Sequence, residues 1–194
     1  MEEKKLYHFG AWSAFVMALM LIINGIATFI PPYWLFWVSR VGIVLGGFGV
    51  LPAVWRQVKE DEAGWSTWLT ALAFLGLSAE GLNYIGKANI DSSWLPFGGL
   101  SAWAVGMNII GIRARCWPIG MGVLGIVSGL LLFAVVLANT LVPNNIVNTL
   151  SAGLGAVVLY PAWLVWMGIR MLRRFSLSLI QPVQFSDVLL QPPT

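Results

Sequence analysis

The sequence predicts an all-α, polytopic transmembrane bundle of six helices, and three observations lead to that class. Hydrophobic residues make up 58% of the 194 residues and charged residues only 10%, with a mean hydropathy of +0.81. Soluble domains do not carry so much apolar surface. The apolar residues form continuous stretches close to the ~20 residues that a bilayer-spanning helix needs. These stretches are rich in Gly, Ala and Leu and lack the alternating pattern of a membrane β-barrel.

The spans are delimited by short polar or proline-containing breaks. We expect them at residues 9–30, 33–55, 66–86, 96–113, 117–139 and 147–171. The first ends at Pro31-Pro32, and the charged stretch 56–64 separates the second from the third. Residues 87–94 follow the third, a tight turn at 113–118 follows the fourth, and Pro143-Asn144-Asn145 precedes the last. The expected domains are therefore a transmembrane unit, 1–174, and a cytoplasmic C-terminal tail, 175–194.

Basic residues set the expected orientation, because Lys and Arg are retained on the cytoplasmic side of a membrane. Of the eleven basic residues, Arg40 lies deep within a predicted span. Nine of the other ten fall on one side of the six-span arrangement: Lys4, Lys5, Arg56, Lys59, Arg113, Arg115, Arg170, Arg173 and Arg174. Only Lys87 falls on the other side. Both termini are thus predicted to be cytoplasmic, in a multi-pass protein of the cell inner membrane.

Most of the eleven tryptophans fall near the predicted span ends. Indole rings favour the headgroup zone, where the apolar body and the polar N–H are both accommodated. We expect that location for Trp12, Trp55, Trp65, Trp68, Trp117 and Trp166 on the inner side, and for Trp34, Trp37 and Trp94 on the outer side.

Two opposite charges, Arg40 and Glu80, lie inside otherwise apolar spans. Each is about 10 Å below the outer boundary at 1.5 Å per residue, so adjacent antiparallel helices would let them meet. An unpaired charge at such depth costs at least ~2.5 kcal/mol. Helical spacing places Glu80 on one face with Ala73, Gly76, Asn83 and Tyr84, opposite Leu75 and Leu82. With Asn24 at similar depth, these residues predict an intramembrane polar centre, read either as a packing ion pair or as a lined cavity.

Glycine and proline positions predict how the helices pack. Gly42 and Gly46, like Gly125 and Gly129, form GxxxG patterns that let another helix approach closely, within the bundle or in a dimer. Gly47 lies seven residues beyond Arg40 and shares its face. Pro161 removes a backbone donor in the middle of the last span, which marks it as a hinge candidate.

The chemistry-bearing residues are few. One histidine, His8, and one cysteine, Cys116, argue against a multi-histidine metal site, bis-histidine haem and an internal disulfide. We therefore expect no metal, no cofactor, no catalytic residues and no enzyme activity. The scattered basic residues do not form a nucleic-acid-binding segment.

Residues 160–173, Tyr-Pro-Ala-Trp-Leu-Val-Trp-Met-Gly-Ile-Arg-Met-Leu-Arg, resemble the last helix of small six-helix bacterial membrane proteins of a domain-of-unknown-function family. The resemblance implies a prokaryotic inner-membrane protein without assigned activity.

Two functions lead from the sequence, and a membrane enzyme, which would need a cofactor or substrate group to supply the chemistry, ranks third. The first is a non-enzymatic scaffold, accessory subunit or regulator, whose partners are the lipid bilayer and another membrane subunit or a second copy. The alternative is a small transporter or channel that uses the polar centre at Arg40 and Glu80.

Overall fold

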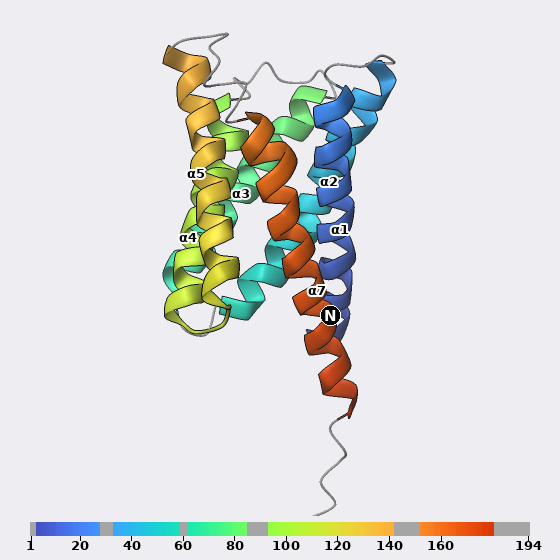
Figure 1. Ribbon diagram of the computed structural model, residues 1–194, viewed down its shortest axis with the longest axis vertical. Helices are drawn as coiled ribbons and strands as arrows, with labels where there is room; N and C mark the ends of the chain where they lie inside the picture. The colour runs from blue at the N-terminus through green and yellow to red at the C-terminus, as the bar shows by residue number, and fades with distance from the viewer. Residues whose placement is uncertain (1–2, 28–32, 59–61, 85–92, 142–151, 181–194) are drawn as a thin grey trace, which may run out of the picture.

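The regular structure of the protein is entirely helical in the part that the computed structural model describes, residues 3–27, 33–58, 62–84, 93–141 and 152–180 (Figure 1). Six α-helices lie in these ranges: α1 Glu3–Ala27, α2 Tyr33–Val58, α3 Ala63–Tyr84, α4 Gly99–Arg113, α5 Ile119–Leu141 and α7 Tyr160–Ile180. Two short π-helical segments, η1 Ser93–Gly98 and η2 Ala152–Leu159, run directly into α4 and α7.

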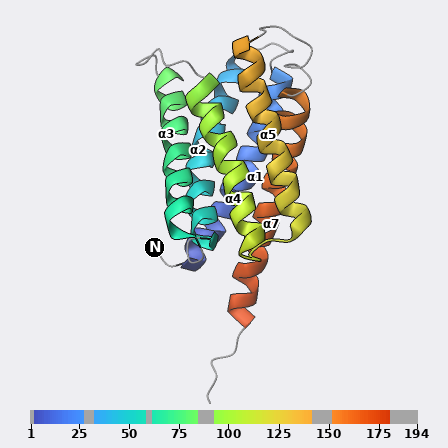
Figure 2. The same ribbon diagram turned by 90° about the vertical axis from the view of Figure 1, so that its left-hand side faces the viewer.

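The helices form a ring in chain order. Each helix packs against the next, η2 and α7 follow α5, and α7 returns to the side of α1 (Figures 1 and 2). Successive helices run in opposite directions, so the start of α1 and the end of α7 lie at the same end of the bundle, the lower end in Figure 1. We call this the terminal end.

Small residues bring α1 and α2 into close contact along most of their length. A Cβ at Gly46 would lie 2.8 Å from the Cβ of Met17 and 3.0 Å from the carbonyl oxygen of Ser13. Further toward the terminal end, Gly10 of α1 faces Ala53 of α2 in the same way. From the first pair to the second, the residue number rises in α2 and falls in α1. This is the arrangement of two antiparallel helices with closely spaced backbones.

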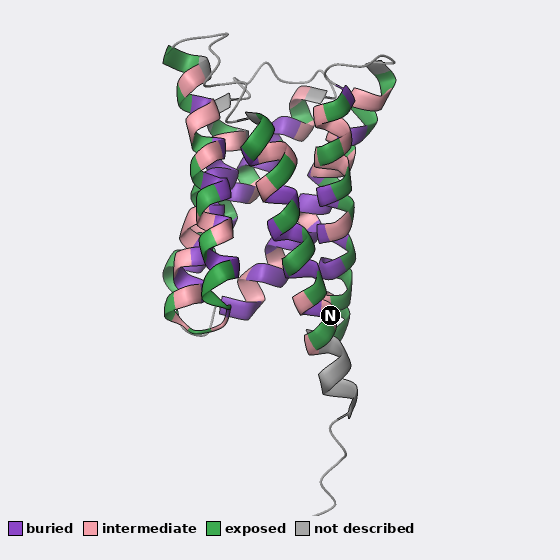
Figure 3. Cartoon of the chain, in the orientation of Figure 1, coloured by how far each residue is buried: buried purple, intermediate pink, exposed green. Residues whose placement is uncertain are grey.

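Large apolar side chains divide between the interior and the outer surface. Buried residues line the inside of the ring, whereas the outward faces of the helices are exposed (Figure 3). On α3, Leu75 and Leu82 are exposed, while Ala73 and Leu77 are buried. Apolar residues on the outer surface are expected where the surrounding solvent is lipid.

Four stretches are long and apolar enough to cross a membrane: Lys4–Ala27, Trp34–Val58, Ile119–Ala138 and Gly153–Arg174. They belong to α1, α2, α5 and the η2–α7 helix. The other two predicted spans correspond to α3 and α4. Polar residues such as Thr70, Ser78 and Glu80 make α3 less hydrophobic, and the α-helical part of α4 has only 15 residues.

Helix ends differ from the predicted boundaries. α2 continues to Val58, and α7 runs to Ile180, past the expected end of the last span at 171 and into the expected tail. Backbone hydrogen bonding continues a helix beyond the apolar run that hydropathy detects, so such ends are poorly defined by sequence.

Candidate functional site

Arg40 and Glu80 lie on adjacent helices, α2 and α3, and face each other. Arg40 Nη1 is 3.9 Å from Glu80 Oε1, and the two side chains are 27% and 8% exposed, respectively. The carboxylate is therefore the more deeply buried partner. At this separation the two charges attract strongly in a medium of low dielectric constant.

An aromatic ring and small residues surround the pair. The guanidinium carbon of Arg40 lies 4.4 Å from the centre of the Phe36 ring, one helical turn earlier, which is a cation–π geometry. One face of α3 carries Glu80 together with Ala73 and Gly76, all buried. Further along the same contact, Gly47 of α2 accommodates the Leu77 side chain of α3. Small residues thus bring the helices close enough for the charges to meet.

The other residues of the predicted polar centre lie on α1 and at the end of α3. Asn24 Nδ2 donates to Ser39 Oγ at 3.0 Å, which links α1 to α2 beside Arg40, and Ser39 Oγ donates to the Phe36 carbonyl at 2.8 Å. Asn83 is half-buried near the end of α3. The side chain of Tyr84 lies outside the described residues. The structure therefore brings together Arg40 and Glu80, with the Asn24–Ser39 bond as their neighbour.

The predicted packing glycines all face helices of the same chain. A Cβ at Gly42 would meet Met20 of α1, and one at Gly46 would meet Met17 of α1. A Cβ at Gly129 would lie 2.8 Å from Val105 of α4, and one at Gly125 would overlap the side chain of Asn108. Both GxxxG patterns thus bring together consecutive antiparallel helices.

Pro161, the hinge candidate, is the buried second residue of α7, and α7 directly follows the π-helical segment η2. A proline cannot donate to the carbonyl four residues earlier, and a wider π-helical turn is one way in which a helix accommodates that loss. A second proline, Pro96, lies within η1.

A buried aromatic cluster in the centre of the bundle was not predicted. Trp163 Nε1 donates to Asn108 Oδ1 at 3.0 Å, which joins α7 to α4, while Asn108 Nδ2 donates to the Ala104 carbonyl. Trp103 packs edge-on against Trp163, with ring centres 5.9 Å apart, and Tyr160 lies against Trp163 at 5.4 Å. The bond to Trp163 confirms the expectation from the sequence that Asn108, a polar residue in an apolar span, forms a hydrogen bond across the bundle. The aromatic rings around this bond were not predicted.

A second group of polar contacts, also not predicted, holds the turn between α4 and α5. Arg115 adopts a left-handed backbone conformation with φ 53°, which lets this turn reverse the chain within a few residues. Arg170 and Arg174 of α7 both donate to the carbonyl oxygen of Cys116, and Cys116 Sγ contacts the Gln57 carbonyl of α2. The turn is therefore tied to α2 and α7.

Trp117, one of the tryptophans expected at the headgroup level, is buried within the bundle. The side chain is only 3% exposed, its Nε1 donates to Gln57 Oε1 at 3.2 Å, and its ring covers Gly111. Tryptophan burial here satisfies the indole N–H by a side chain rather than by the headgroup region. By contrast, Trp12, Trp34, Trp37, Trp65, Trp68 and Trp166 are exposed.

Among the described residues, no group of three or more His, Cys, Asp or Glu side chains could hold a metal ion. His8 Nε2 accepts a hydrogen bond from Trp12 Nε1, one turn along α1. Other polar contacts, such as Asn24–Ser39 and Asn108–Trp163, connect one helix to another.

Comparison of the chain with protein-family models, with curated proteins and with solved structures finds no match.

Proposed function

We propose that this protein is a non-enzymatic, multi-pass subunit of the cell inner membrane that acts as a scaffold, accessory subunit or regulator. One observation carries the proposal: interior polar side chains connect helices. Arg40 and Glu80 join α2 to α3, Asn108 and Trp163 join α4 to α7, and Ser101 Oγ donates to the Gly129 carbonyl to join α4 to α5. A rigid bundle of this kind suits a protein that presents a fixed surface.

The membrane arrangement within this proposal has six spans with both termini cytoplasmic. The antiparallel ring of six α-helices supports an even number of crossings, and the basic residues at the terminal end support its cytoplasmic location. Cys116 is the only cysteine and lies in the α4–α5 turn at that end. A membrane-impermeant maleimide should label it in inverted vesicles and not in right-side-out vesicles; the reverse pattern would refute the orientation.

A small transporter or channel is the second candidate, favoured by the ion pair itself. Intramembrane ionisable groups often mark ion or proton pathways. Arg40 keeps 27% of its side chain exposed beside the buried Glu80, so one member of the pair is accessible from outside the bundle.

A variant with both charges removed, Arg40→Gln/Glu80→Gln, distinguishes the two functions. The full chain is purified gently from its membrane for native mass spectrometry, and is also reconstituted in vesicles for ion and proton flux. If the protein is a scaffold, accessory subunit or regulator, native mass spectrometry should show a stoichiometric partner or second copy. The folded double variant should retain it. Isolation of a single chain whose vesicles conduct, with flux lost in the folded double variant, would instead establish transport.

A further inference from the structure

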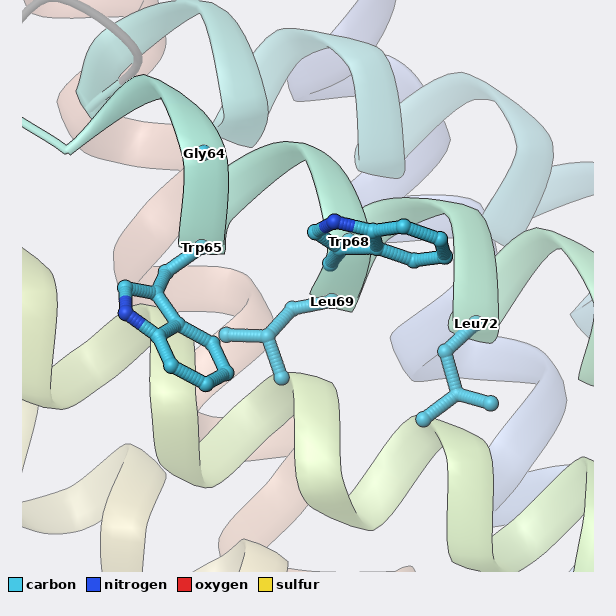
Figure 4. Close-up of a pocket in the computed structure, with 5 residues that line it drawn as sticks. All are labelled: Gly64, Trp65, Trp68, Leu69 and Leu72. Atoms are coloured by element: carbon cyan, nitrogen blue, oxygen red, sulfur yellow. The ribbon is translucent and has the colours of Figure 1, made fainter.

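The contact between α3 and α4 opens into a groove at the terminal end of the bundle. Two adjoining hollows share Trp65 and Leu69. The larger, of about 640 Å³, runs along α3 past Gly64, Trp68 and Leu72 (Figure 4). The smaller, of about 320 Å³, reaches Glu62 before α3 and Arg113 at the end of α4. The groove thus has an apolar trough and a charged mouth.

The trough begins at Gly64, a residue without a side chain. A Cβ at Gly64 would meet no atom within 4 Å, so this position leaves free space beside the two indoles. Trp65 and Trp68 are 70% and 75% exposed, which is high for such large apolar side chains. Tryptophan rings at the end of a membrane helix lie at the level where lipid headgroups meet acyl chains. An extended apolar trough that starts at this level has the shape and polarity to receive an acyl chain.

The mouth carries two opposite charges with an aromatic ring beside them. Glu62 and Arg113 line the same hollow as Trp65, and both are exposed. Guanidinium groups bind phosphate through paired hydrogen bonds. A carboxylate accepts from a primary ammonium, and the face of an indole attracts the same cation. An anionic headgroup could use Arg113 but would be repelled by Glu62.

We propose that this groove is a binding site for a phospholipid with a phosphoethanolamine headgroup, drawn from the leaflet at the terminal end. Arg113 binds the phosphate, Glu62 and Trp65 bind the ammonium, and one acyl chain lies between Trp65, Trp68 and Leu72. The inference rests on the membrane insertion proposed above. Resistance of the protein to alkaline extraction from membranes tests insertion separately, so failure of the lipid site would be distinguishable from failure of insertion.

The test is native mass spectrometry of the delipidated full chain in detergent, titrated with dioleoyl phosphatidylethanolamine, phosphatidylcholine or phosphatidylglycerol. We expect phosphatidylethanolamine to bind about tenfold more tightly than phosphatidylglycerol. Its ammonium can donate a charge-assisted hydrogen bond to Glu62, whereas the anionic headgroup of phosphatidylglycerol is repelled by Glu62. Phosphatidylcholine should rank between them, because its quaternary ammonium contacts the indole but cannot donate to Glu62.

Three variants and one control locate the site. Glu62→Gln should remove the preference for phosphatidylethanolamine, Arg113→Gln should weaken all three lipids, and Gly64→Leu should fill the trough and lower lipid occupancy about tenfold or more. Gly153→Leu is the matched control, since a Cβ there also meets no atom within 4 Å and η2 lies away from the groove. Tighter binding of phosphatidylglycerol, equal binding of all three lipids, or unchanged occupancy in Gly64→Leu would overturn the proposal.

Discussion

Removal of both charges of the Arg40–Glu80 pair should destabilise the bundle by less than the sum of the two single removals. At 3.9 Å and an effective dielectric constant of about 20, the attraction is about 4 kcal/mol, and desolvation of the two groups offsets much of it. Breaking a buried pair from one side costs about 3–5 kcal/mol, because a charge is left buried alone. Since Arg40 is 27% exposed and would keep its contact with the Phe36 ring, we expect Glu80→Gln to lower the unfolding free energy by about 2–3 kcal/mol. Arg40→Gln should cost more, as Glu80 is only 8% exposed.

The measurement is a double-mutant cycle on unfolding free energies, obtained by reversible SDS titration of the protein in mixed micelles. The double variant Arg40→Gln/Glu80→Gln should lose less than the sum of the single variants, with a coupling free energy of about 1–3 kcal/mol. Glu62→Gln, which removes an exposed carboxylate at the other end of the bundle, should change stability by less than about 0.5 kcal/mol. Additive losses for Arg40 and Glu80 would refute direct pairing as the reason for their placement.

Two further substitutions test packing and the turn. Gly125→Ala should destabilise the protein by about 1–3 kcal/mol, because its Cβ would overlap a buried asparagine side chain of α4; thermal unfolding measures this, and a loss no larger than that of Gly153→Ala would contradict the reasoning. Gln57→Leu should cost about 1–3 kcal/mol by leaving the buried Trp117 Nε1 without its acceptor. It should also speed maleimide alkylation of Cys116, and an unchanged rate would show that Gln57 does not hold this turn.

The helical architecture follows from the sequence because the bilayer constrains it strongly. A chain whose apolar stretches approach ~20 residues has few alternatives to spanning helices. The antiparallel order then follows from the short connections. The same argument placed Arg40 and Glu80 at one depth on facing helices, since both positions could be counted from a common membrane boundary.

The contacts at the terminal end required tertiary information. A tryptophan that is buried inside the bundle and one that is exposed on its outer surface have the same hydropathy and can lie equally near a span end. What distinguishes Trp117 from Trp65 is Gln57, a residue 60 positions away that accepts its N–H. Likewise, nothing in the local sequence shows that Arg170 donates to the Cys116 carbonyl rather than to the headgroup region.

The helix contacts differ in a way that bears on the proposed lipid. Polar contacts join α1 to α2 through Asn24, and α2 to α3 through Glu80. Between α3 and α4, the Leu69 side chain packs against Gly106 and the Leu72 carbonyl lies beside Gly99. A headgroup held between Glu62 and Arg113 would add a polar connection between these helices. Lipid binding at this groove should therefore stabilise the bundle, because any ligand that binds the folded state alone raises its unfolding free energy.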